Sequence, residues 1–337
     1  MKMAESEDKT LLHRQFSSDS ELDTTTLSGT LPIPSLTPSS TFKLLGPVGE
    51  ELITPSSLSV SNSGEIVVSD SESCFIVIYS CQCNYLSHFS TIPRMMFYVF
   101  FDTDFYKPHQ VAWLSSRRVV FTQPKGSRII VSDWTGKCHV TIEGRPLYEP
   151  YGIMVDQSDN IYVTDKQKGR ILCYSCEGKL IQTLGKLGCN NVNLTSPHFI
   201  QHSNSEDTFY VNHIMKDKIV ISVYNKDGKL KQHLTPKMDL ASDGRSLGQF
   251  VVLEDDSIVY LDNPDQSNTD IVVLKGKLAI RDGMKNGHVN NTECISKIYK
   301  LDYAISAISL TNDRNLIFIN SKSKCVHVHS LKMPYTD

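Results

Sequence analysis

Eight side chains stand at comparable places along the chain and could contact a ligand. Three carry rings that can stack on unpaired bases: His109, Tyr151 and His198. Five are lysines, whose ammonium groups can bind a phosphate backbone: Lys125, Lys166, Lys168, Lys216 and Lys322. The chain carries a net charge of −3, so basic residues gathered on one face would set that face apart. Ordinary solvated lysines explain the same five positions equally well.

A repeated pattern determines where these residues lie. Counted from an anchor, apolar residues recur at +3, +11 and +13, and a small polar residue recurs at +15. Apolar residues two apart, in short runs broken by Gly, Asn, Asp and Ser, indicate β-strands. The anchors are Pro55, Pro108, Pro150, Pro197, Leu247 and Ile305, at intervals of 53, 42, 47, 50 and 58 residues. This spacing fits propeller blades of four antiparallel strands.

The sequence therefore predicts an all-β protein, a six-bladed β-propeller of four-stranded antiparallel blades. Too few residues follow Ser330 to form an outer strand in the last blade. We expect an N-terminal strand at about 42–46 to pair there and remove both exposed sheet edges. The predicted organisation is a disordered Ser/Thr-rich tail over 1–41, the propeller over 42–331 and a short tail over 332–337.

The candidate residues are expected to share one face of the ring. In a meandering blade, the link into the first strand and the link between the second and third strands open on the same side. His109, Tyr151 and His198 directly follow anchors, and the five lysines fall in the second set of links. Four further cations begin the third strand of a blade, where we expect contacts within the blade: Arg128, Arg170, Lys218 and Lys324.

The third repeat carries a family resemblance. From Tyr148 to Tyr174 it reads YEPYGIMVDQSDNIYVTDKQKGRILCY, which is similar to the NHL repeat. The resemblance extends over about 42–331, strongly in the first and third blades and weakly in the fifth and sixth. It implies a propeller like those that end the TRIM-NHL proteins, which bind protein partners or RNA. The Cys/His zinc clusters and heptads of TRIM proteins are missing from this sequence, so ligase activity is not implied.

We therefore expect a non-catalytic interaction module, a protein-binding scaffold or adaptor resembling the substrate-recruiting domain of TRIM-NHL ubiquitin ligases. The alternative is a post-transcriptional regulator that binds single-stranded RNA through the loop face. On this interpretation the protein is not an enzyme, has no catalytic residues, metal or cofactor, and acts on neither a small-molecule substrate nor a membrane. Salt-sensitive RNA binding that depends on Lys166, Lys168 and Lys216 would separate the two alternatives.

A remote enzymatic alternative also comes from the resemblance. Peptidyl-amidating lyases of the NHL fold place a histidine after the anchor proline in alternate blades, where three imidazoles bind zinc. Pro108-His109 and Pro197-His198 match, but the third position is Ile305-Ser306. His213 could serve as a third ligand only from the same blade as His198. Zinc therefore lacks a complete ligand set in the sequence.

The nine cysteines form no framework, which favours free thiols in a reducing compartment. Cys173-Tyr-Ser-Cys176 is a C-x-x-C by count alone, because Cys173 lies in a predicted strand with no helix after it. No secretory signal is recognisable, and we expect a cytoplasmic location.

Two segments fit the blade scheme poorly. Residues 95–101, Met-Met-Phe-Tyr-Val-Phe-Phe, are either a strand buried on both faces, an insertion over the rim, or an exposed docking patch. In the tail, the serines from Ser17 to Ser20 lie between Arg14 and Glu21 and resemble a phosphorylation cluster. A plain solvated tail explains that cluster equally well.

Overall fold

The computed structural model describes residues 35–46, 49–93, 102–185, 194–203, 207–215, 218–234, 248–262, 269–274, 291–292, 297–301 and 303–332. Several predicted features therefore lie outside the described residues. These are residues 1–34 of the tail, the apolar segment 95–101, Lys216, the anchor Leu247 and the last five residues.

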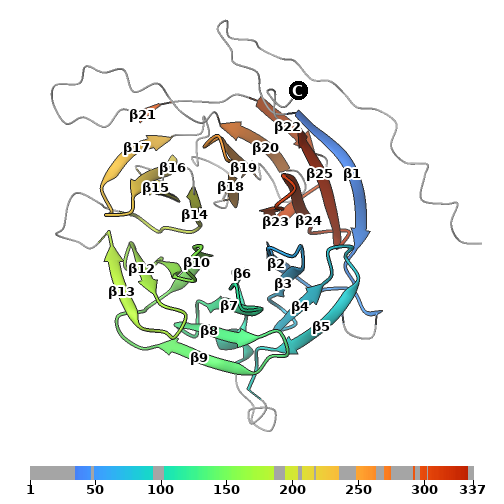
Figure 1. The fold of residues 1–337 in the computed structure, drawn as a ribbon, viewed down its shortest axis with the longest axis horizontal. Coiled ribbons are helices and arrows are strands. Elements are labelled where there is room, and N and C mark those ends of the chain that lie inside the picture. Colours follow the sequence, from blue (N-terminus) through green and yellow to red (C-terminus); the bar gives the residue numbers. More distant parts are fainter. Residues whose placement is uncertain are drawn as a thin grey trace, which may run out of the picture. The chain divides into compact units, whose positions relative to one another are not determined.

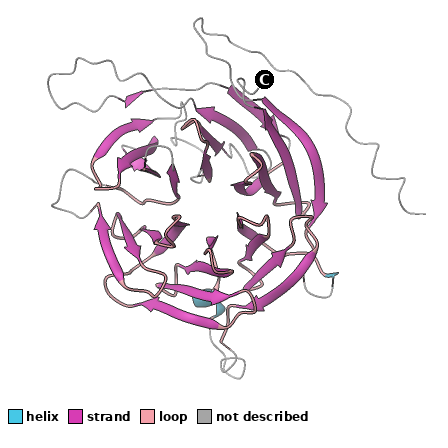
Figure 2. Cartoon of the chain, viewed as in Figure 1, coloured by secondary structure: helices cyan, strands magenta, loops and turns pink. Residues whose placement is uncertain are grey.

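The described residues form six antiparallel blades around a common centre (Figure 1). The prediction of an all-β, six-bladed propeller with four-stranded blades is confirmed. Figure 2 shows that the described chain is strand and loop apart from very short helical turns, of which η3 (Thr103–Tyr106) lies in the link between the first two blades. No helix in this part of the chain is long and apolar enough to span a membrane.

The first three blades follow the chain order without exception. Blade 1 contains β2 (Pro55–Val60), β3 (Ile66–Asp70), β4 (Phe75–Tyr79) and β5 (Tyr85–Ser90). Blade 2 contains β6 (Val111–Trp113), β7 (Arg118–Gln123), β8 (Arg128–Asp133) and β9 (Cys138–Glu143). Blade 3 contains β10 (Pro150–Val155), β11 (Ile161–Asp165), β12 (Arg170–Tyr174) and β13 (Leu180–Leu184).

The last three blades each depart from that order or length. Blade 4 contains β14 (Ile200–Ser203), β15 (Thr208–Met215), β16 (Lys218–Asn225) and β17 (Leu230–Leu234), and the short β21 (Asn291–Thr292) pairs with β17 in parallel. Blade 5 contains β18 (Phe250–Val252), β19 (Ile258–Asp262), β20 (Thr269–Leu274) and β22 (Lys297–Leu301). Blade 6 contains β23 (Ile305–Leu310), β24 (Asn315–Asn320), β25 (Cys325–Lys332) and β1 (Ser35–Lys43).

The N-terminal strand closes blade 6, as predicted. β1 pairs antiparallel with β25, from Ser35 opposite Lys332 to Lys43 opposite Cys325 (Figure 1). The strand begins earlier than the predicted 42–46, so residues 35–41 belong to the propeller and not to the tail. A register shift between Pro38 and Ser40 accommodates the proline, which has no N–H to donate.

The core lies between blades. Six clusters of buried apolar side chains each join two neighbouring blades. One cluster packs Leu58 and Val77 of blade 1 against Ile319 and Val326 of blade 6. Inner strands such as β3 and β19 are buried along their whole length, and the packed blades hold the loops at their ends in fixed positions.

Candidate functional site

The residues that directly follow the anchors lie at, or just before, the start of the innermost strand of each blade (Figure 1). We call these six residues the inner ring: Ser56, His109, Tyr151, His198, Gly248 and Ser306. A hydrogen bond from the preceding blade fixes most of them. Ser69 Oγ donates to the His109 carbonyl at 2.8 Å, and Thr122 Oγ1 donates to the Tyr151 carbonyl at 2.9 Å. The next two blades repeat the contact, from Thr164 Oγ1 to His198 and from Asn212 Nδ2 to Gly248, both at 2.8 Å.

Blades 5 and 6 lack this donor, because the equivalent positions hold the buried apolar residues Leu261 and Ile319. Gln249 replaces both donors. Its Nε2 donates to the carbonyls of Ser306 at 3.3 Å and Ser56 at 3.0 Å, and its Oε1 accepts from the N–H of Ile308 at 3.2 Å. The inner ring is therefore closed by hydrogen bonds through all six blades.

The side chains of His109, Tyr151 and His198, predicted to share one face, contact one another on the inner ring. The centroids of His109 and Tyr151 lie 3.9 Å apart, and those of Tyr151 and His198 lie 4.7 Å apart. Phe199, one residue after His198, lies 6.1 Å from Tyr151 and 6.5 Å from His109. We call His109, Tyr151 and His198 the aromatic cluster; it comes from three successive blades.

Hydrogen bonding and burial set the protonation of the aromatic cluster. His198 Nδ1 lies 2.7 Å from the carbonyl of Ser196, which can only accept, so Nδ1 carries the proton and Nε2 carries the lone pair. Burial lowers the pKa of His198 to about 4 and that of His109 to about 4. Burial also raises the pKa of Tyr151. At neutral pH the cluster therefore holds two neutral imidazoles and one protonated phenol.

His109 and Ser306 add polar atoms that the described residues leave unsatisfied. His109 Nδ1 and Ser306 Oγ are buried, and neither has a hydrogen-bond partner within the described part of the chain. Buried polar atoms without partners are uncommon, because each loses its hydration without replacement. Both atoms belong to the inner ring, where a bound molecule could satisfy them.

Lys166 and Lys168 contact the site in different ways. Lys166 Nζ lies 4.5 Å from the ring centroid of Tyr151 and 4.0 Å from a carboxylate oxygen of Glu149. Lys168 Nζ lies 4.1 Å from the ring centroid of Tyr148, outside the aromatic cluster. Lys166 is therefore the predicted lysine that the structure brings against the cluster.

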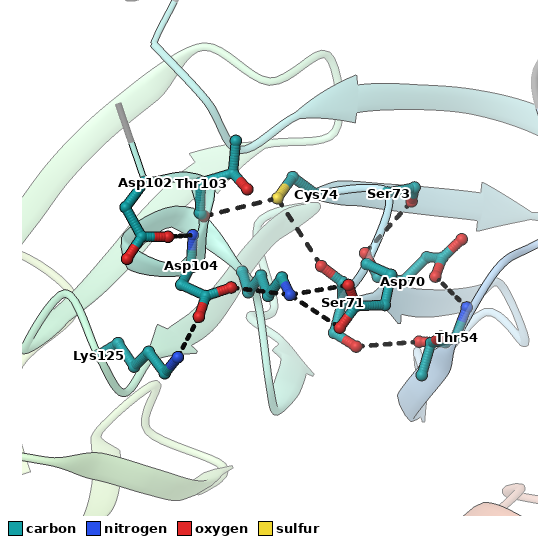
Figure 3. A network of polar contacts seen from close by, with 11 residues as sticks. Thr54, Asp70, Ser71, Ser73, Cys74, Asp102, Thr103, Asp104 and Lys125 are labelled. Carbon is teal, nitrogen blue, oxygen red and sulfur yellow. Dashed lines mark hydrogen bonds and ion pairs between the residues drawn. The ribbon is translucent and has the colours of Figure 1, made fainter. Parts of the chain in front are cut away.

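Lys125 belongs to a separate network at the junction of blades 1 and 2. Its ammonium pairs with Asp104, whose other carboxylate oxygen lies 2.8 Å from Lys107 Nζ (Figure 3). Lys107 also pairs with Glu72 at 2.7 Å. Hydrogen bonds from Lys107 and Lys125 hold the pKa of Asp104 at about 2. Nearby, Sγ of the buried Cys74 lies 3.9 Å from the carbonyl oxygen of Thr103, the first residue of η3 (Figure 3).

The remaining predicted residues do not join the cluster. Lys322 is exposed on blade 6, and Lys216 lies outside the described residues. Of the cations that begin third strands, Arg170 makes the expected contact within its blade, because it pairs with the buried Asp165 at 3.1 Å. Arg128 instead donates to the carbonyl of Phe105 at 2.9 Å, in the link before blade 2.

His213 lies away from the inner ring's side chains. Its Nε2 is 2.7 Å from Ser222 Oγ, which is also 2.7 Å from His233 Nδ1, so the imidazole is engaged inside blade 4. Among the described residues, no group of three or more His, Cys, Asp or Glu side chains could hold a metal ion.

Three residues that contact the inner ring or the predicted lysines were not predicted from the sequence: Phe199, Gln249 and Asp104. Gln249 follows a weak anchor, and Phe199 was hidden by its more conspicuous neighbour His198. Asp104 lies in the long link before blade 2, where no repeat column points to it. An apolar or amide side chain two residues after an anchor is the signal that could have identified Phe199 and Gln249.

No protein family model matches the sequence, and no curated protein is significantly similar to it. Solved structures do match. The chain is similar to virginiamycin B lyase from Staphylococcus aureus, with a TM-score of 0.56 and 13% identity, covering 89% of this chain and 100% of the lyase. It is similar to a gluconolactonase from Xanthomonas campestris, with a TM-score of 0.56, 14% identity and coverage of 87% and 89%. A luciferin-regenerating enzyme matches with a TM-score of 0.57, 9% identity and coverage of 88% and 96%.

These comparisons establish the six-bladed propeller and correct the functional interpretation. The expectations of a non-catalytic scaffold and of a non-enzyme are contradicted, because the similar structures include a lyase, a gluconolactonase and a luciferin-regenerating enzyme. The NHL pattern misled because it describes how a blade packs, whereas function depends on the few side chains that a blade carries at its ends. A protein partner, single-stranded RNA and a cytoplasmic location stay predictions.

Proposed function

We propose that this protein is an enzyme that opens a cyclic ester by proton transfer at the aromatic cluster. His198 is the proposed general base, and Tyr151 with Lys166 stabilises the negative charge that develops on the carbonyl oxygen. The observation that carries the proposal is the fixed tautomer of His198, whose Nδ1–H is held by the Ser196 carbonyl at 2.7 Å. That bond leaves Nε2 as the proton acceptor.

The neighbouring groups suit the negative charge of the transition state. Tyr151 keeps its phenolic proton because burial raises its pKa, so its hydroxyl can donate a hydrogen bond. The Lys166 ammonium, 4.5 Å from the Tyr151 ring, supplies positive charge beside it. Preorganised donors of this kind are among the largest contributors to catalysis of acyl chemistry.

The proposed reaction begins when His198 Nε2 accepts a proton. If the proton comes from water, the oxygen of that water forms the new bond to the carbonyl carbon, and the ring C–O bond breaks. If it comes from a carbon, the C–H electron pair becomes a C=C bond as the ring C–O bond breaks to a carboxylate. In both cases the proton then leaves His198 for the departing oxygen or for solvent.

The names of the similar structures support the substrate class. A gluconolactonase acts on a lactone, and virginiamycin B lyase has also been solved with quinupristin as a catalytically inactive histidine-to-alanine variant. A propeller of this fold can therefore depend on a histidine for catalysis. His198 and His109 are the inner-ring histidines of the described chain.

The test is ring opening of a panel of lactones and cyclic depsipeptides by the purified protein. His198→Gln should lower kcat/KM by about 100-fold or more, because general-base catalysis contributes at least that much. His139→Gln, on the exposed outer strand β9, is the matched control and should leave kcat/KM unchanged.

Two results would contradict the proposal. One is an absence of turnover across the panel; the other is a fully active His198→Gln protein. Mass spectrometry of products formed in oxygen-18 water identifies the route, because hydrolysis adds one labelled oxygen and elimination adds none.

We also propose that the blades are NHL repeats. The support is the ion pair between Arg170, the first residue of β12, and the buried Asp165, the last residue of β11. The two residues lie opposite each other across these strands, and both belong to the segment that resembles an NHL repeat. Comparison of many related sequences, once aligned on the six anchors, would test this relationship.

A further inference from the structure

A cavity lies between blades 1 and 2, on the outer side of the ring and separate from the aromatic cluster. Its volume is about 790 Å³. Residues of the outermost strands β5 and β9 line it together with residues of β7 and β8 (Figure 1). Cavities of roughly 300–1,000 Å³ hold small organic ligands.

Aromatic side chains form much of the wall. Phe75 and Phe89 come from blade 1, Phe121 comes from blade 2, and Tyr106 comes from the link between them. The rings of Phe89 and Phe121 lie 6.3 Å apart across the junction of the two blades. This wall suits a ligand with an apolar body the size of one or two rings.

The charge of the lining is one-sided. Arg128 and Lys137 line the cavity, and none of the described lining residues is Asp or Glu. Arg128 packs on the Tyr106 ring at 4.6 Å and donates to the carbonyl of Phe105, but it pairs with no described carboxylate. Its Nε is buried and without a partner in the described structure. Arg128 as a whole is half-buried, so its guanidinium has no described counterion and can still be approached from the cavity, which favours an incoming anion.

We propose that this cavity is a binding site for an apolar organic anion, a molecule with a ring-sized hydrocarbon body and one carboxylate or sulfonate group. The aromatic wall would bind the body, and Arg128 and Lys137 would bind the anionic group. The proposal does not depend on the enzymatic one, because it shares no residue with the aromatic cluster.

Two matched probes test it. Anilinonaphthalene sulfonate carries the proposed anionic group, whereas phenylnaphthylamine has the same rings without the charge. The full chain should bind the sulfonate with saturable fluorescence at one site, and about 10-fold more tightly than the neutral probe, as expected for a charged hydrogen bond. Absence of saturable binding, or equal affinity for the two probes, would overturn the proposal.

Variants assign the binding to the cavity. Arg128→Met should weaken the sulfonate about 10-fold and leave the neutral probe unchanged. Lys137→Met removes an exposed cation without touching the core, so it tests the charge even if Arg128→Met folds poorly. Arg118→Met, at the start of β7 but outside the lining, should bind both probes normally. Equal affinity for the sulfonate in all these variants would contradict the assignment.

Cys138 offers a second measurement. It is exposed and lines the cavity, whereas the exposed Cys81 does not. Saturating sulfonate should slow alkylation of Cys138 by iodoacetamide and leave that of Cys81 unchanged, as followed by peptide mass spectrometry. Equal protection of both thiols, or of neither, would place the probe elsewhere and refute the site.

Discussion

At the scale of single residues, Gln249 is the side chain on which closure of the inner ring depends. Four blades donate a hydrogen bond to the next blade from a Ser, Thr or Asn of their own second strand. Blades 5 and 6 present Leu261 and Ile319 there, which pack into the core instead. One amide serves both places because its two hydrogens can point to different carbonyls.

Replacement of Gln249 should destabilise the fold. Gln249→Leu removes three hydrogen bonds and leaves the Ser306 carbonyl without that donor, so we expect the free energy of unfolding to fall by about 2–4 kcal/mol. Urea denaturation followed by circular dichroism measures this change.

Gln110 provides the matched control. It occupies the same position two residues after its anchor, and its Nε2 has no hydrogen-bond partner among the described residues. Gln110→Leu should therefore change the free energy of unfolding far less. A loss for Gln110→Leu as large as that for Gln249→Leu would show that the inner-ring bonds contribute little.

The residues of the site were only partly predictable. The repeat columns placed His109, Tyr151 and His198 correctly on one ring, because their position in a blade depends on spacing alone. The sequence did not reveal that Lys125 is held by Asp104, since a contact across a link has no periodic signal. It also could not show that His198 donates to the Ser196 carbonyl, which depends on local backbone geometry.

At the scale of elements, β1 is the strand whose sequence predicts it least well. Its residues Ser35–Lys43 include Pro38 and mostly small polar side chains, so no alternation of apolar residues is visible. The strand forms because β25 presents an open edge, and near the end of β1 the Phe42 side chain packs against the core between blades 6 and 1. Tertiary pairing here overrides local preference.

Loss of β1 should open blade 6. A chain that lacks residues 1–43 leaves the edge of β25 unpaired, and we expect the free energy of unfolding to fall by about 3 kcal/mol or more. An unpaired edge also favours association with other chains. Denaturation and size-exclusion chromatography report the two effects.

A shorter deletion separates the strand from the tail. Removal of residues 1–34 alone keeps all of β1 and should preserve both stability and oligomeric state. If the two deletions behaved alike, pairing of β1 with β25 would not be what stabilises blade 6.

At the scale of the whole molecule, burial of histidines couples stability to pH. Burial lowers the pKa of four histidines to about 4: His109, His198, His213 and His329. Burial also lowers the pKa of His233 and His327. The usual pKa of each is 6.5, so between these values the unfolded chain binds more protons than the native one.

Stability should therefore decrease on acidification. The free energy of unfolding should be largest above about pH 6.5 and should fall progressively toward pH 4, because each buried imidazole then resists protonation. Urea titrations at about pH 7, 5.5 and 4.5 measure the trend.

One variant isolates the contribution of a single histidine. His329→Gln, which removes one buried imidazole of β25, should make the decrease less steep. A free energy of unfolding that stays constant from pH 7 to pH 4.5 would contradict the burial of these side chains.

The pairing of β1 with β25 also sets an order of events during synthesis. Thr41 contacts His327 across 286 residues of sequence, so β1 has no partner until β25 leaves the ribosome. At roughly 5–20 residues per second, that wait lasts on the order of tens of seconds. For that time the nascent chain presents both an unpaired strand and an unclosed ring. The ring therefore closes only after β25 has been made, and a site that needs the closed ring forms only then.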